Sequence, residues 1–281
     1  MKNYYGLVAS MPDLSPDDAK LNFTVADFKE DYWPQLSASD KKLVSLFFLQ
    51  YDHRNLLALL EDGEDAVFDE RAMFSREELA GVLEKVKSED EQGRTLPAYF
   101  YDFVAEYAGL RETGERLPED VLSAAYYRYA ATVSGHGFFS EWFVFNRNVN
   151  NILIALTARK YGFSPSPFLI GDDEVTMTLA TSGLRDFGLG TELDYLDEVI
   201  RIHEAADPVE KERRLDLLKW EWLEEHTFFC YFSVERLFAF LIRLDIIERW
   251  THIDKERGGK VFRDLVEQLK NDVELPQEFR K

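Results

Sequence analysis

The sequence predicts an all-α protein that contains three copies of one helical unit. Helix-start signals recur along the 281 residues. Strict alternation of apolar and polar residues between turns, which is typical of a half-buried strand, is nearly absent. A stretch that begins FFLQYDHRNLLALL at Phe47 also has two later counterparts, FVFNRNVNNILIAL from Phe143 and FLIRLDIIERWTHI from Phe240.

The helices follow from capping and stop signals. Ser37 and Ser75 each stand three residues before an acid, the spelling of a capping box. Gly63 and Gly162 follow two of the apolar patterns and are typical helix ends. The sequence therefore predicts helices over about 38–62, 97–112, 118–134, 138–161, 192–205, 209–227, 233–254 and 260–272, with another after Ser75. Turns are expected at 88–97, 164–167 and around Asp207-Pro208.

The three copies share two polar positions three residues apart, and successive copies are separated by 96 and 97 residues. These positions are Asp52 and Asn55, Asn148 and Asn151, and Asp245 and Glu248. Between the first two copies the spacing continues, since Glu78 and Glu174 are also 96 apart. Chance apolar matches are common in amphipathic helices, but a constant spacing of polar positions is not. The pattern predicts units over residues 1–98, 99–195 and 196–281, the last shortened.

We interpret these six positions as structural. Residues three apart lie on one face of a helix, and a partly buried Asn has donors and an acceptor that can bond a neighbouring backbone segment. A contact point for a partner in each unit is the alternative. Glu248 cannot donate a hydrogen bond when charged, which argues against one chemical role in all three copies. No catalytic, cofactor-binding or metal-binding residue is assigned.

Composition limits the classes of partner. The chain has 33 Lys and Arg against 53 Asp and Glu, a net charge of −20. Such a charge disfavours nucleic acid and anionic lipid, whose binding needs basic residues. It weakly favours a basic protein partner, although a solvated acidic surface is the commoner explanation. The single Cys230 fits a reducing compartment, and no apolar stretch approaches the roughly 18–20 residues of a spanning helix, so a cytoplasmic protein is expected.

Signatures of catalysis are weak. Gly258-Gly259-Lys260 resembles the end of a phosphate loop but lacks its Ser or Thr, and is interpreted as a helix-start turn. The acids 172–174 are similar to the magnesium-binding aspartates of helical prenyl-transferring enzymes, but Thr176 replaces a required Asp, and acids at a helix N-terminus explain them better. The aromatic pairs are interpreted as core packing, together with Cys230: Tyr126-Tyr127, Phe138-Phe139, Trp142-Phe143 and Phe228-Phe229. We therefore expect no enzyme, no cofactor, no metal and no small-molecule substrate.

Four stretches carry a resemblance to a known family. YDHRNLLALL at 51–60 and NVNNILIALTARKYG at 148–162 resemble the D-x-x-N-L helix segments of the C subunit of V-type ATPases, known in eukaryotes as the d subunit. MFSREELAGVL at 73–83 is similar to the segment that often follows, and SVERLFAFLIRLDIIERW at 233–250 resembles the last repeat. YYGLVASMPDL at 4–14 resembles a bacterial family of unknown function encoded among V-type ATPase genes. Asp62 and Glu248 depart from the pattern of the V-type family, where a basic residue and an Asn are usual.

The resemblance implies three units in a pseudo-threefold arrangement and a role without catalysis. The protein would couple the rotating central stalk of a V-type ATPase or ATP synthase to the membrane ring of ion-carrying subunits. Both would be its partners, and it would lie in the cytoplasm, peripheral to the inner membrane through the complex. The alternatives are a helical scaffold or adaptor, an assembly factor, and a helical magnesium-dependent enzyme.

Overall fold

A computed structural model describes residues 3–272 except 17, 19, 90, 91, 115 and 136, with side chains up to residue 253. This part of the chain is all-helical and has no strand, which confirms the predicted fold class. The helices are α1 (Tyr5–Ser10), α2 (Val25–Asp27), α3 (Ala38–Asp62), α4 (Arg76–Lys87), α5 (Ala98–Thr113), α6 (Pro118–Val133), α7 (Phe138–Tyr161), α8 (Glu174–Thr181), α9 (Leu196–Glu204), α10 (Pro208–Thr227) and α11 (Val234–Asp272). A π-helical turn, η1 (Phe28–Tyr32), and two 3₁₀ turns, η2 (Trp33–Gln35) and η3 (Gly63–Asp65), complete it.

Local chemistry explains where these helices begin and end. The Ser37 Oγ accepts the Asp40 amide at the start of α3, and Ser75 and Glu78 form a complete capping box at α4. Asp173 caps α8, which agrees with the interpretation of acids 172–174 as a helix N-terminus, although the bounds of this helix were not predicted. Gly162 ends α7 at φ 75°, a left-handed conformation that glycine adopts without a Cβ clash. The predicted bounds of α3 and α7 agree with the structure.

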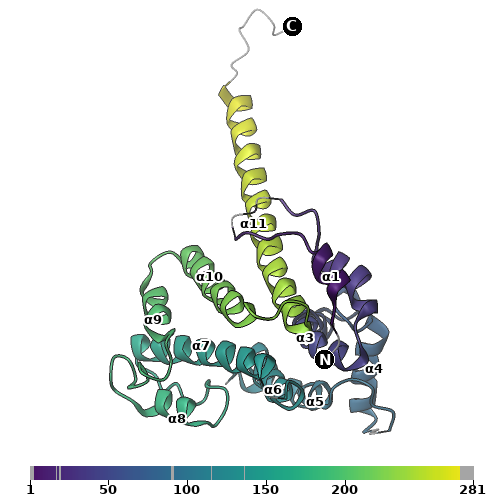
Figure 1. The fold of residues 1–281 in the computed structure, drawn as a ribbon. Helices are drawn as coiled ribbons and strands as arrows, with labels where there is room; N and C mark the ends of the chain where they lie inside the picture. Colours follow the sequence, from purple (N-terminus) through teal and green to yellow (C-terminus); the bar gives the residue numbers. More distant parts are fainter. Residues whose placement is uncertain are drawn as a thin grey trace, which may run out of the picture.

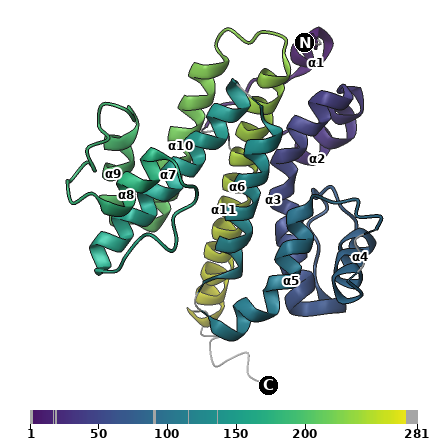
Figure 2. The ribbon, with the colours of Figure 1, turned by 90° about the horizontal axis from the view of Figure 1, so that it is seen from below.

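Three long helices, α3, α7 and α11, organise the packing, as Figure 2 shows from below. The helix α6 contacts both α3 and α7, while α10 contacts α9 and α11, and α11 also contacts α3 and α2. The core between them is rich in aromatic rings, with Phe48 and Phe100 at 0% exposure. From α10, Trp222 reaches α7, where its ring stacks on Phe145 at 5.2 Å. In the described part of the chain, three helices thus connect each long helix to the next.

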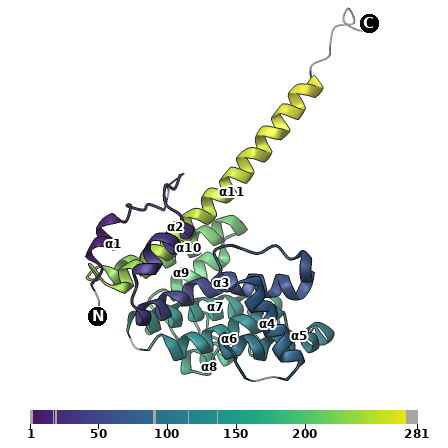
Figure 3. The same cartoon turned by 90° about the vertical axis from the view of Figure 1, so that its right-hand side faces the viewer.

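The predicted break at Gly258-Gly259-Lys260 is wrong, because α11 runs without interruption from Val234 to Asp272. A glycine inside a helix costs roughly 1 kcal/mol relative to alanine but removes no backbone hydrogen bond, so two of them weaken a helix without ending it. Figures 1 and 3 show the C-terminal part of α11 standing out from the body.

Two further predictions need correction. Phe228 and Phe229 lie in the turn between α10 and α11 with 66% and 80% of their surface exposed, so this pair is not core packing, and Cys230 beside them is only partly buried. The reason is that α10 ends at Thr227, which leaves the pair beyond the helix. The other three aromatic pairs are wholly or largely buried, as predicted. None of the helices in the described part of the chain is both long and apolar enough to cross a membrane.

Candidate functional site

The second polar position of the repeat binds backbone in the first two copies. Asn55 on α3 donates to the Asp69 carbonyl at 3.1 Å and accepts the Asp69 amide at 2.7 Å. Asn151 on α7 makes the same pair of bonds with Ile170, at 2.8 and 2.9 Å. Each amide therefore holds the segment that returns over its own helix, at the approach to α4 and to α8.

The first polar position differs between these copies. Asp52 is fully buried, and its Oδ1 accepts the amides of Met73 and Phe74 at 2.9 and 2.8 Å. Its Oδ2 has no hydrogen-bond partner among the described residues. Burial raises the pKa of Asp52 to about 7, although the two amides and the charge of Lys29 lower it. In the second copy, Asn148 donates to the Tyr195 hydroxyl at 3.3 Å.

The third copy faces the first copy and the N-terminal segment. Asp245 on α11 accepts a 2.5 Å hydrogen bond from the Tyr51 hydroxyl, and Glu248 accepts the amide of Val25, the first residue of α2, at 3.0 Å. The Arg71 guanidinium stacks over the Tyr51 ring and lies 3.8 Å from both acids. Burial raises the pKa of Asp245, while Tyr51 and Arg71 oppose that shift. Asp245 and Glu248 thus meet residues of α3 and of the segments on either side of it.

A cavity of about 300 Å³ lies between α3, α6, α7, α10 and α11, so residues of all three long helices line it. Its charged lining residues are Asp216 and Lys219 from α10, and Asp245 and Arg249 from α11. Asp216 accepts hydrogen bonds from Arg249 and, at 2.8 Å, from the Trp250 indole. No hydrogen bond or ion pair joins Lys219 to another described residue, and burial lowers its pKa although Asp216 raises it. We call this the central cavity.

Apolar, aromatic and neutral polar side chains, His53 among them, complete the lining of the central cavity. His53 is in contact with the Tyr99 hydroxyl at 2.7 Å, and burial lowers the pKa of His53 to about 3. The imidazole is therefore uncharged near neutral pH and does not titrate there. A volume of about 300 Å³ is at the lower end of ligand pockets and accommodates a few side chains, not a folded domain.

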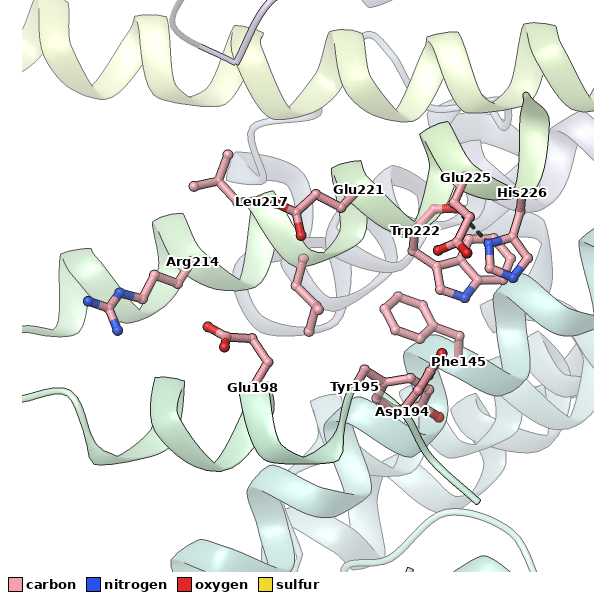
Figure 4. Close-up of a pocket in the computed structure, with 11 residues that line it drawn as sticks. Phe145, Asp194, Tyr195, Glu198, Arg214, Leu217, Glu221, Trp222, Glu225 and His226 are labelled. Atoms are coloured by element: carbon pink, nitrogen blue, oxygen red, sulfur yellow. Dashed lines mark hydrogen bonds between the residues drawn. The ribbon is translucent and has the colours of Figure 1, made fainter. Parts of the chain in front are cut away.

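A second concave site is a groove between α9 and α10, with α7 beneath it, of about 570 Å³. Its floor is aromatic: Trp222 stacks on Phe145 at 5.2 Å and on His226 at 3.7 Å, and Tyr195 meets Phe145 edge-on at 4.9 Å. Carboxylates surround this floor, as Figure 4 shows. They are Asp194, Glu198, Glu221 and Glu225. We call this the α9–α10 groove.

The acidic cluster at 172–174 is built as a helix cap. Asp173 accepts bonds from the Thr176 amide and hydroxyl, both at 2.9 Å, and pairs with Arg147. Burial raises the pKa of Asp173, but these bonds and the Arg147 charge hold it below its usual value. Across the described residues, no three His, Cys, Asp or Glu side chains lie close enough to hold a metal ion.

Several residues of these sites were not singled out from the sequence. Lys29 donates hydrogen bonds to the carbonyls of Glu70 and Ala72. These bonds join the N-terminal segment to the segment after α3. A lone Lys or Arg gives no pattern from which its partner can be read. The α9–α10 groove could have been found from the sequence, because the motif Asp-aromatic-x-x-Glu occurs both at 102–106 and at 194–198, 92 residues apart.

These features define an all-helical protein in which three long helices line a central cavity and hold backbone segments through buried or half-buried polar side chains. The chain matches, over residues 1–273, the family described as a protein of unknown function (DUF2764), and it belongs to that family. Comparison with curated proteins and with solved structures found no match.

Proposed function

We propose that this protein is a non-catalytic, C-like central-stalk subunit of a bacterial V-type ATPase or ATP synthase. It would lie in the cytoplasm, peripheral to the inner membrane, and couple the rotating stalk to the membrane ring of ion-carrying subunits. Its partners would be the stalk and ring proteins, with no nucleic acid, no inserted lipid and no small-molecule substrate.

The observation that carries this proposal is a contact repeated on the three long helices. On α3, Asp52 and Asn55 hold the backbone that leads into capped α4, and on α7, Asn151 holds the backbone that leads into capped α8. On α11, Glu248 holds the first amide of α2, which is also capped. This recurrence supports three units in a pseudo-threefold arrangement over 1–98, 99–195 and 196–281, with α2 of the first unit packed against α11 of the third.

The central cavity supports an axial binding role. Residues from α3, α7 and α11 all line it, so a partner on the axis of the three units would meet similar surfaces on every side. Because the cavity admits only a few side chains, the stalk protein would lie over the opening of the cavity and insert a few of its own side chains. Asp216 and Asp245 lie there beside Lys219 and Arg249, which suits a partner that carries both signs of charge.

The test is affinity purification of the full chain from its native cells at low ionic strength, followed by mass spectrometry of the bound proteins. Salt screens exposed charge pairs, so a parallel wash at high ionic strength is expected to release the partners of so acidic a protein. The proposal predicts recovery of stalk and ring subunits in near-stoichiometric amounts. If those subunits are present in the lysate but absent from the low-salt eluate, the ATPase role is wrong and the scaffold or adaptor alternative replaces it.

A permanent subunit and an assembly factor differ in a second measurement. Purification of the assembled ATPase through a tagged stalk protein is expected to recover this chain at a constant ratio through growth. Its presence only in partial complexes that lack the catalytic head would assign it to assembly.

A further inference from the structure

The α9–α10 groove has a twin within the same chain. A groove of about 350 Å³ between α5 and α6 is lined by Asp102, Phe103 and Glu106, and the α9–α10 groove has Asp194, Tyr195 and Glu198, each 92 residues later. The residues on the opposite wall of each groove also match between the two grooves, at a spacing of 93 residues in the sequence. There, Ala125, Arg128, Tyr129 and Thr132 on α6 match Leu218, Glu221, Trp222 and Glu225 on α10.

The difference between the twins is one of charge. Both keep the Asp and Glu of the first wall, but Arg128 on α6 is replaced by Glu221 on α10, and Thr132 by Glu225. The α5–α6 groove thus contains a cation, Arg128, among lining residues that include two acids. The α9–α10 groove has four acids, and the one Lys or Arg among its lining residues, Arg214, pairs with Glu210 at 2.5 Å and lies at the far end in Figure 4.

The four carboxylates are largely uncompensated. Glu198 pairs with Arg201 at 3.1 Å, but no hydrogen bond or ion pair from a described residue reaches the carboxylates of Asp194, Glu221 or Glu225. Glu221 and Glu225 are four apart on α10, so they repel each other along one helix face. Figure 4 shows both descending from α10 toward the space into which Glu198 rises from α9. Such an arrangement weakens the isolated fold and suits a cation supplied from outside.

The floor favours one kind of cation. Trp222 and His226 are stacked in parallel over the buried Phe145, so the half-buried Trp222 and the exposed His226 supply planar aromatic surface between the carboxylates. A guanidinium stacks on aromatic faces and binds carboxylates through paired N–H groups, whereas an ammonium does neither as well. We propose that the α9–α10 groove binds an arginine side chain of a basic segment of a partner protein, in the position that Arg128 occupies in the twin. The inference does not depend on the proposed function.

The experiment uses the full chain and an alanine-based peptide with two arginines one helical turn apart, with lysine and glutamine versions as probes. Binding is followed by the NMR signal of the Trp222 indole N–H, assigned from Trp222→Phe. We expect the arginine peptide to shift this signal at low ionic strength, the lysine peptide to bind more weakly, and the glutamine peptide not to bind. If the arginine peptide binds without moving the Trp222 signal, or not at all, the inference is wrong.

A substitution that copies a residue of the α5–α6 groove into the α9–α10 groove makes the test specific. Glu221→Arg copies the residue of the α5–α6 groove, and it should reduce affinity about tenfold or more, a loss typical of removing one close charge pair. Because it replaces a repulsion with an attraction to Glu225, it should fold with an unchanged or higher melting temperature. Glu112→Arg, at an exposed position on α5, changes the net charge equally and should keep the affinity. Equal losses in both variants would show that only bulk charge attracts the peptide, which would overturn the inference.

Discussion

The segments that return over α3 and over α7 are held by equivalent asparagines, but the chemistry at the first polar position of the repeat differs between the two helices. Over α3, the buried carboxylate of Asp52 accepts two backbone amides, and Asn55 holds the half-buried Asp69. Over α7, a neutral Asn148 stands at the first position, Arg147 pairs with the cap Asp173, and Asn151 holds the buried Ile170. A buried carboxylate makes stronger bonds to amides but depends on pH, whereas a neutral amide does not.

The largest effect on the free energy of unfolding should come from replacing Asn151, and it should exceed the effect of replacing Asn55. Asn151→Ala leaves the amide and carbonyl of buried Ile170 without partners, and should lower the free energy of unfolding by about 2–4 kcal/mol. Asn55→Ala frees the same two groups of Asp69, but water reaches them, so about 1–2 kcal/mol is expected. Urea denaturation followed by circular dichroism measures both. Asn150→Ala, on α7 beside Asn151, is the control and should cost less than about 0.5 kcal/mol. Equal costs at Asn55 and Asn151 would contradict this account of burial.

The next largest effect on stability comes from Asp52→Asn. This substitution gives the first copy of the repeat the asparagine that the second copy has at Asn148, and so tests the contrast in charge. The pKa of Asp52 is raised from 3.8 to about 7 on folding, so the folded protein holds a proton that the unfolded chain releases. The stability of the wild type should therefore fall as pH rises from about 4 to about 7. An Asn oxygen can still accept the amides of Met73 and Phe74.

Asp52→Asn should therefore be more stable than the wild type at pH 8, by about 1–3 kcal/mol, and nearly equal to it at about pH 5. Thermal denaturation across this pH range measures the difference between the two proteins. Parallel curves for variant and wild type would show that Asp52 does not titrate in this window.

The smallest effect concerns the third copy. Glu248→Gln keeps an acceptor for the Val25 amide but removes the charge, and a neutral hydrogen bond is roughly half as strong as a charged one. We expect a loss below about 1 kcal/mol, confined to the N-terminal segment. Hydrogen exchange of the Val25 amide should accelerate severalfold while amides of α7 stay unchanged. An equal acceleration in α7 would mean that the variant loosens the whole fold.

Local patterns were sufficient for much of the fold. The bounds of α3 and α7 follow from Ser37, Gly63 and Gly162, since caps and glycine ends act within a few residues. The bounds of α1, α2, α8 and η1 did not follow from the sequence, although acids 172–174 indicated the start of α8, because elements this short show no clear periodicity and some are held by distant contacts such as Glu248 with Val25. The expected break in α11 does not occur, because the cost of two glycines is local and the remaining residues of the helix offset it.

The candidate sites divide in the same way. The six polar positions were found by spacing alone, while their partners at Asp69, Ile170 and Val25 lie in segments with no spacing in common. The central cavity could not be predicted from the sequence, since its charged residues lie on α10 and α11 and come together only when these helices pack. The twin grooves were within reach, because the spacing of 92 and 93 residues is present in the sequence.

The bond between Glu248 and Val25 joins residues 223 positions apart, so it also sets an order of assembly. As the chain leaves the ribosome, α3 and α4 can pack at once, whereas the segment that holds α2 and η1 must wait for α11. Until α11 is made, Phe28, which is fully buried in the folded protein, lacks its stacking partner Phe240. The N-terminal segment can therefore close onto the fold only after α11 is made, and loss of either partner would uncover apolar residues of the other.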